Sequence, residues 1–250
     1  MIRHHGMTIE TRIKQAGASE VIASNLGLEL YEENPEIIET IDELCKAGQE
    51  PFKVMTGRYE AIGSGMNSYV WRIGGIALKA STDKTGRKAW LGLNGHENLI
   101  DHFIAMHSLE EYFLRNENGF VRAPKQLLAF RLPDKSNYKL EEFIPDSCNL
   151  QTKISTWSLS YDEQLAICES VKTRFAKSLR DPRFKLILYE LRHSNNLNNL
   201  LVPNKTSYMD VKSMPIVVID QPDHLTIGNY PLHLLIKSLK ILPPSLIYVS

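Results

Sequence analysis

The stretch Gly63-Ser64-Gly65-Met66-Asn67-Ser68 decides how this chain is interpreted. It lies between two short apolar runs, residues 59–62 and 69–73, and a third apolar run, residues 76–80, contains Lys79. Glycines let a loop come close to phosphate groups, and a lysine supplies a fixed positive charge. A glycine-rich turn between two strands, with a lysine on the following strand, predicts a site for a nucleoside triphosphate.

Length and composition are those of an ordinary globular protein. The 250 residues suffice for one large domain or two lobes, and 43% of them are hydrophobic and 23% charged. Lys plus Arg and Asp plus Glu number 29 each, so the formal net charge is zero. This balance argues against bulk nucleic acid or an anionic membrane as the main partner.

Cysteine usage and hydropathy indicate a cytoplasmic protein. Cys45, Cys148 and Cys168 are odd in number and widely spaced, which predicts reduced thiols rather than a disulfide framework or a zinc ribbon. The first residues lack the apolar stretch of a signal peptide, and no run of about 18 apolar residues occurs. We therefore expect no membrane-spanning segment.

The hydrophobic pattern predicts a mixed chain of helices and short strands. Asn34-Pro35 is typical of a helix start, and isoleucines and leucines then recur at helical spacing. Ser160 and Glu163 form a capping-box pair that begins a later helix. Helices are also expected over residues 96–116 and 231–241. The expected strands are residues 59–62, 69–73, 76–80, 121–130, 138–144, 185–189, 200–202 and 215–219.

Lys79 needs a carboxylate to hold its side chain in place, and the predicted helix 96–116 offers one. Glu110 follows Phe103 by two helical turns on the apolar face, while Glu111 projects toward the side. Because an unpaired buried charge is costly, we expect Glu110 to pair with Lys79. The alternative is a glutamate at the helix edge, in contact with water.

These segments resemble the protein-kinase-like superfamily, which includes protein kinases, small atypical kinases, and aminoglycoside and choline phosphotransferases. The resemblance is carried by residues 62–70, Ala77-Leu78-Lys79, Glu110 and Leu140-Glu141-Glu142-Phe143-Ile144-Pro145. It implies an α+β, two-lobed fold. The expected parts are an N-terminal helical extension (1–55), a kinase-like N-lobe (56–145) and a reduced C-lobe (146–250).

Two segments of the second half resemble the catalytic loop and the metal-binding segment of that superfamily. Residues 191–202 contain His193 and Asn199, and Asp220 follows the apolar residues 216–219. The resemblance implies that Asn199 and Asp220 bind Mg²⁺, which prefers oxygen ligands. Asp210 is a rival for the metal position, but the apolar run directly before Asp220 favours Asp220.

The resemblance further implies ATP as cofactor, together with Mg²⁺, and assigns residues to the site. Catalytic roles fall to Lys79, Glu110, Asn195 and Asp220. Adenine would be bound by the hinge that follows the strand 138–144. The residues expected to contact the nucleotide are Ile62, Gly63, Ser64, Gly65, Ser68, Val70, Lys79, Glu142 and Ile144.

The catalytic loop departs from the superfamily pattern at its general base. Counting from His193 places Asn195 at the aspartate position, and counting from Asn199 places Ser194 there. Loss of a positioned base costs a factor of about 10² to 10⁴ in rate. Asp220-Gln221-Pro222 replaces Asp-Phe-Gly, and the sequence has no Ala-Pro-Glu segment.

Three functions follow as hypotheses. The first is an active ATP-dependent phosphotransferase with a protein or small-molecule acceptor, and with neither nucleic acid nor membrane as partner. The second is a pseudokinase that acts as an interaction or regulatory module. The third is an unrelated α+β binding protein in which the glycine turn is incidental.

Overall fold

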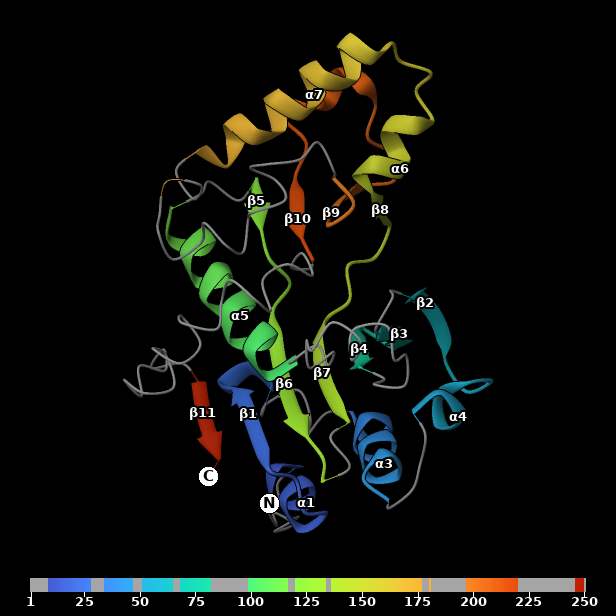
Figure 1. Ribbon diagram of the computed structural model, residues 1–250, viewed down its shortest axis with the longest axis vertical. Coiled ribbons are helices and arrows are strands. Elements are labelled where there is room, and N and C mark those ends of the chain that lie inside the picture. Colours follow the sequence, from blue (N-terminus) through green and yellow to red (C-terminus); the bar gives the residue numbers. More distant parts are fainter. Residues whose placement is uncertain are drawn as a thin grey trace, which may run out of the picture. The chain divides into compact units, whose positions relative to one another are not determined.

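The computed structural model describes ten parts of the chain, and within them the protein is an α+β chain with mostly antiparallel strands (Figure 1). This confirms the predicted α+β class. The described residues are 9–27, 34–46, 51–64, 68–81, 99–116, 120–133, 136–176, 180, 197–219 and 246–249.

The chain divides into two compact units. Unit 1 comprises Met1–Ile104, Gln126–Phe143 and Leu242–Ser250, and unit 2 comprises Ala105–Lys125 and Ile144–Ile241. Each unit has its own sheet and its own apolar core.

Unit 1 is built on a sheet in which every neighbouring pair of strands is antiparallel, in the order β11-β1-β6-β7-β4-β3-β2. Figure 1 shows β1, β6 and β11 side by side. The strands are β1 (Glu20–Ser24), β2 (Glu60–Ser64), β3 (Ser68–Ile73), β4 (Ile76–Ser81), β6 (Gln126–Arg131), β7 (Asn137–Glu142) and β11 (Leu246–Val249).

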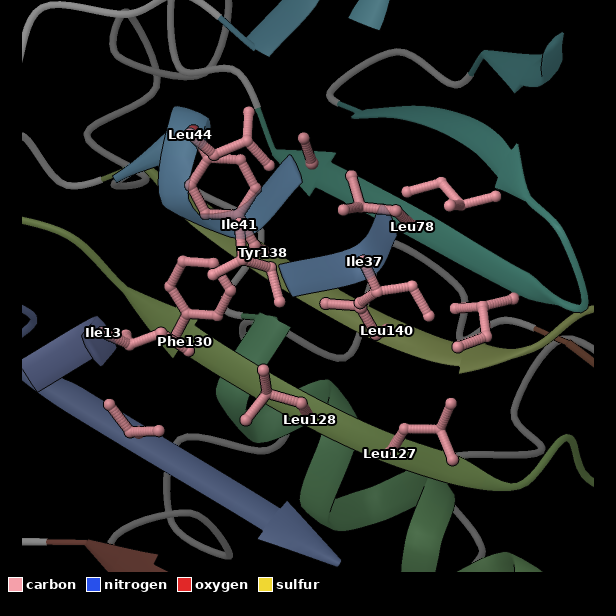
Figure 2. Packing of buried hydrophobic residues seen from close by; sticks show 14 of the residues in the cluster. Ile13, Ile37, Ile41, Leu44, Leu78, Leu127, Leu128, Phe130, Tyr138 and Leu140 are labelled. Atoms are coloured by element: carbon pink, nitrogen blue, oxygen red, sulfur yellow. The ribbon is translucent and has the colours of Figure 1, made fainter. Parts of the chain in front are cut away.

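One face of this sheet is apolar and packs against helices from the first part of the chain. The helices are α1 (Ile9–Gln15), α3 (Pro35–Leu44) and α4 (Pro51–Met55). Leucines and aromatic residues of β4, β6 and β7 fill the core with the isoleucines of α3 (Figure 2). The labelled members are Ile13, Ile37, Ile41, Leu44, Leu78, Leu127, Leu128, Phe130, Tyr138 and Leu140.

Local sequence signals explain several of these elements. Asn34 is the N-cap of α3 and Pro35 its first residue, as predicted, although the Asn34 side chain makes no capping bond. Gly74 and Gly75 connect β3 to β4, with Ile73 opposite Ile76. Gly74 has a φ of 57°, a left-handed conformation that favours glycine in such two-residue turns. The predicted hairpin is confirmed.

Two expectations for unit 1 were wrong. Residues 1–55 are not purely helical, because β1 is a buried strand between β6 and β11. Its partners lie more than a hundred residues further along the chain, so no local signal marks it. The predicted strand 121–130 is two strands: Val121–Arg122 (β5) belongs to the other sheet, and the break contains Pro124, which has no N–H for a sheet ladder.

Unit 2 contains a smaller sheet in the order β5-β10-β9-β8, in which only the β5–β10 pair is parallel among the described strands. Its strands are β5 (Val121–Arg122), β8 (Ser147–Asn149), β9 (Leu200–Pro203) and β10 (Ile216–Val218). The predictions of β9 and β10 are confirmed, whereas β8 was not predicted. The sheet and the helices around it enclose a separate core that includes Phe113, Val171 and Phe175.

The helices of unit 2 follow strong local signals. They are α6 (Leu150–Ser155), α7 (Tyr161–Arg174) and, from Ala105 onward, the long helix α5 (Leu99–Asn116). Ser160 and Glu163 form the predicted capping box at the start of α7. The short helix α6, with Asn149 as its N-cap, was not predicted.

Cys45, Cys148 and Cys168 carry thiols and form no disulfide, as predicted. None of the helices in the described ranges has the length and hydropathy that crossing a membrane requires. The predicted strand 185–189 and helix 231–241 lie outside the described residues.

Candidate functional site

The second face of the unit 1 sheet, called the polar face below, carries several buried polar side chains, and Lys79 is one of them. Residues alternate between the two faces of a strand, so Leu78 and Ala80 of β4 enter the apolar core while Lys79 and Ser81 lie on the opposite face. Lys79 is only 5% exposed and Ser81 only 2%. A lysine this deeply buried is uncommon, because its charge must be compensated.

The strands that flank the glycine loop are neighbours in the sheet, and one of them, β3, lies directly beside β4, the strand of Lys79. Gly63 of β2 is opposite Val70 of β3, and Val70 is in turn opposite Lys79 of β4. The structure thus brings three of the predicted nucleotide-binding residues into one row across the sheet. Ile62 sits at an irregularity in the β2–β3 pairing and is 38% exposed.

Nothing in the described fold requires glycine at position 63. Gly63 does not have a positive φ, and a Cβ at this position would meet Val70 at 3.9 Å, an ordinary contact. Of the other loop residues, Ser64 pairs with Tyr69 and Ser68 pairs with Ser81 through the backbone. Gly65 lies outside the described residues.

A buried ionic cluster that the sequence reasoning missed lies next to Lys79. Lys139 of β7 is fully buried, and its Nζ donates to Glu141 Oε2 at 2.7 Å and to His102 Nδ1 at 2.9 Å. Gln126 Nε2 donates to the same Glu141 oxygen at 3.0 Å. Apolar and polar residues alternate along Asn137–Glu142, which places Lys139 and Glu141 on the face away from the apolar core. This alternation could have predicted the ionic cluster from the sequence.

This ionic cluster joins helix α5 to the polar face of the sheet. His102 is in the first turns of α5, within unit 1, while Lys139 and Glu141 are on β7 and Gln126 is on β6. Because the Lys139 ammonium can only donate, it holds His102 Nδ1 as an acceptor. The helix that follows the lysine strand is therefore fixed to this face at its N-terminal end.

Some backbone groups of the predicted hinge, residues 142–144, already form hydrogen bonds within the protein. Glu142 is opposite Ile76, and the N–H of Phe143 donates to the carbonyl of Gly75 at 3.0 Å. In unit 2, the carbonyl of Ile144 accepts a hydrogen bond from Ser147 Oγ at 2.8 Å. Unit 1 ends at Phe143, so the predicted hinge falls where the chain passes from one unit to the other.

Glu110 lies in the part of α5 that belongs to unit 2, and it is half-buried. His107, one turn earlier, places Nδ1 3.4 Å from Glu110 Oε2 and Nε2 3.6 Å from Glu111 Oε1. The sequence reasoning did not identify His107 as a neighbour of this carboxylate. Because Lys79 belongs to unit 1, its pairing with Glu110 stays a prediction.

Of the two predicted metal ligands, only Asn199 lies within the described residues, in unit 2. Asn199 directly precedes β9, and its carbonyl accepts a hydrogen bond from the N–H of Ile219 at 3.0 Å. Ile219 is the last described residue before Asp220 in the sequence. Asp220 and Asn195 lie outside the described residues.

Asp210, the rival metal ligand, has a structural role. It lies in the short 3₁₀ helix Tyr208–Asp210, and its Oδ2 accepts hydrogen bonds from Ser207 Oγ at 2.6 Å and from the Ser207 N–H at 3.1 Å. These bonds stabilise the carboxylate and lower the pKa of Asp210. This capping role favours Asp220 as the metal ligand.

Clusters of three or more His, Cys, Asp or Glu side chains that could hold a metal ion are absent from the described part of the chain. No family model matches the sequence, and no curated protein matches it either.

Proposed function

We propose that this protein binds ATP with Mg²⁺ in a kinase-like, two-lobed fold and transfers the phosphoryl group to a protein or small-molecule acceptor. The observation that carries the proposal is the buried Lys79 on the strand next to the hairpin β2–β3, in one row with Val70 and Gly63. In kinases a glycine-rich loop covers the phosphates and a lysine on a nearby strand contacts them.

The glycine at position 63 supports this assignment. Since neither a positive φ nor packing within the described fold calls for glycine there, a ligand that must come close to the backbone is a reason for it. The order of elements agrees as well: a loop hairpin, a strand with a lysine, and then the helix α5 with Glu110. The proposed partner of Lys79 is Glu110.

Asn199 and Asp220 are the residues that would hold Mg²⁺. When bound, the metal neutralises the negative charge that develops on the transferred phosphoryl group. The hydrogen bond from the Ile219 N–H to the Asn199 carbonyl ties the backbone of Asn199 to the residue that precedes Asp220 in the sequence. The proposed nucleotide contacts in the hinge, near Glu142 and Ile144, would orient the adenine ring.

A pseudokinase is the second candidate, because Asn195 or Ser194 stands where the superfamily has its general base. Phosphoryl transfer depends mostly on positioning and charge neutralisation, so a loop without the carboxylate can keep reduced activity. A pseudokinase of this fold either keeps ATP binding or acts as an interaction module without ATP.

Calorimetric titration with MgATP tests the proposal. Wild-type protein should bind, and Lys79→Met should weaken binding by about 10-fold or more, since hydrogen bonds to charged groups contribute about 1.5–3 kcal/mol. Lys205→Met, which removes an exposed lysine of unit 2, is the matched control and should bind as wild type does. Equal binding by Lys79→Met would refute the nucleotide site.

Incubation with γ-labelled ATP then separates the two candidates. Transfer of label to the protein itself or to an added acceptor, lost in Asp220→Ala, supports the phosphotransferase. MgATP binding without any transfer supports the pseudokinase.

A further inference from the structure

Asn149, between β8 and α6, uses both ends of its side-chain amide. The carbonyl oxygen accepts the N–H of Thr152 at 3.1 Å and so caps α6. The amino group donates to the backbone carbonyl of Asn198. One side chain therefore connects the first turn of α6 to the residue directly before the proposed metal ligand Asn199.

Two further side chains of α6 bind the same part of the chain. Gln151 Oε1 accepts the backbone N–H of Leu197 at 3.3 Å, and Lys153 Nζ donates to the carbonyl of Asn204 at 2.6 Å. Strand β8 also pairs with β9, with Asn149 opposite Leu201. Segment 197–204 is thus attached to β8 and α6 along its length.

The other side of this segment is attached to β10. Val218 is opposite Leu200, and the Ile219 N–H donates to the Asn199 carbonyl. The backbone of residues 197–199 is therefore held between β8–α6 on one side and β10 on the other. A side chain that must coordinate a cation needs such a fixed backbone, because metal sites depend on residues that orient the ligands.

We propose that Asn149 and Gln151 are positioning residues that fix the backbone from which Asn199 binds Mg²⁺. This inference rests on the proposed function, in which Asn199 is a metal ligand. Both residues act through the backbone of Leu197 and Asn198, and neither has to touch the metal or the nucleotide.

The chain permits variants that separate this role from helix capping. Asn149→Ser keeps an oxygen that can cap α6 but lacks the amino group that reaches Asn198. Gln151→Met removes the acceptor for Leu197, whereas Gln151→Glu keeps it. Gln164→Met is the control, because Gln164 also hydrogen-bonds to the backbone, donating to the carbonyl of Leu159 at the start of α7, away from segment 197–204.

Amide hydrogen exchange of the free protein measures directly how firmly segment 197–204 is held by Asn149 and Gln151. Exchange in residues 197–203 should be about three- to tenfold faster in Asn149→Ser and Gln151→Met, as expected for the loss of one hydrogen bond. Gln151→Glu and Gln164→Met should exchange in this segment as wild type does. Unchanged exchange in both loss variants would overturn the inference.

The Mg²⁺ concentration that ATP binding requires tests whether Asn149 and Gln151 position the metal ligand. The Mg²⁺ concentration that gives half-maximal ATP binding should rise about three- to tenfold in Asn149→Ser and Gln151→Met, and Gln151→Glu should restore the wild-type value. An unchanged requirement despite faster exchange also overturns the inference. If the wild-type protein binds no MgATP, the proposed function fails and the metal role of Asn199 with it, while the exchange data still decide whether Asn149 and Gln151 anchor the segment.

Discussion

Lys79 of β4 lies directly opposite Lys139 of β7, and both residues are buried on the polar face of the same sheet. Like charges on opposing positions of neighbouring strands repel each other. The structure compensates Lys139 with Glu141 and His102, which bind its ammonium group at 2.7 and 2.9 Å. Lys139 thus joins β7 to α5. Lys79, on the opposing strand, is the lysine that we propose for the phosphates.

Lys139→Met should destabilise the protein by about 3–5 kcal/mol, because it leaves the carboxylate of Glu141 buried without its cation. The double variant Lys139→Met/Glu141→Gln should recover at least about 1 kcal/mol of this loss, since it removes the charge and keeps an acceptor for Gln126. Urea unfolding measures both values.

The control for this pair is Lys172→Met, which removes the lysine that pairs with the largely exposed Glu169 on α7. It should cost no more than about 1 kcal/mol. A double variant as unstable as Lys139→Met would show that the charge of Glu141 is not the cause of the loss.

Asp210→Asn should leave the Mg²⁺ concentration for half-maximal ATP binding within about twofold of wild type, because the Asp210 carboxylate is engaged by Ser207. Asp220→Ala should raise that concentration by more than about tenfold if Asp220 is the metal ligand. The opposite result, with Asp210→Asn impaired and Asp220→Ala normal, would exchange the two assignments.

Ser160→Ala should destabilise unit 2 by about 1 kcal/mol, the usual contribution of an N-cap, because Ser160 Oγ accepts the N–H of Glu163 at the start of α7. Thermal unfolding followed by circular dichroism provides the measurement. Ser160→Asp, which can still cap the helix, is the control and should stay within about 0.5 kcal/mol of wild type.

The same capping box should make the stability of the protein depend on pH in the acidic range. Hydrogen bonds from the Ser160 side chain and N–H lower the pKa of Glu163 from its ordinary value of 4.5. A lowered pKa means that this contribution is present above pH 4.5 and is lost as the pH falls below it. Glu163→Gln should therefore flatten the decline in stability below pH 4.5. An unchanged acid profile in Glu163→Gln would contradict this role.

Cys45 should react slowly with alkylating reagents. Burial, with a smaller effect of the Asp42 charge, raises the pKa of the Cys45 thiol from 9.0 to about 12. At pH 9 iodoacetamide should modify Cys45 more than about tenfold more slowly in the folded protein than in urea, because the thiolate is the nucleophile.

The raised pKa of Cys45 also has a consequence for alkaline stability. A thiol that ionises less readily when folded contributes stability below pH 9, and this contribution is lost as the pH rises from 9 toward 12. Cys45→Ala should show a shallower decline across that range. If stability declines equally steeply with pH in wild type and in Cys45→Ala, Cys45 ionises as freely in the folded state as in the unfolded one.

The sequence by itself determined the elements whose signals are local. Alternating strands around a glycine pair predicted β3 and β4, Asn34-Pro35 predicted the start of α3, and Ser160 with Glu163 predicted α7. These patterns work because turn chemistry, capping and side-chain periodicity involve residues a few positions apart.

Only the tertiary structure decided which distant segments pair. Strand β1 joins β6 and β11, and the ionic cluster brings His102 to Lys139 and Glu141, across more than thirty residues of sequence. Asn149 and Gln151 likewise reach a segment almost fifty residues away. Such contacts leave no periodic signal, because each residue type is chosen to suit a partner that the local sequence does not contain. The glycine turn and Lys79 could be found in the sequence, but the burial of Lys79 and its row with Gly63 and Val70 came from the folded sheet.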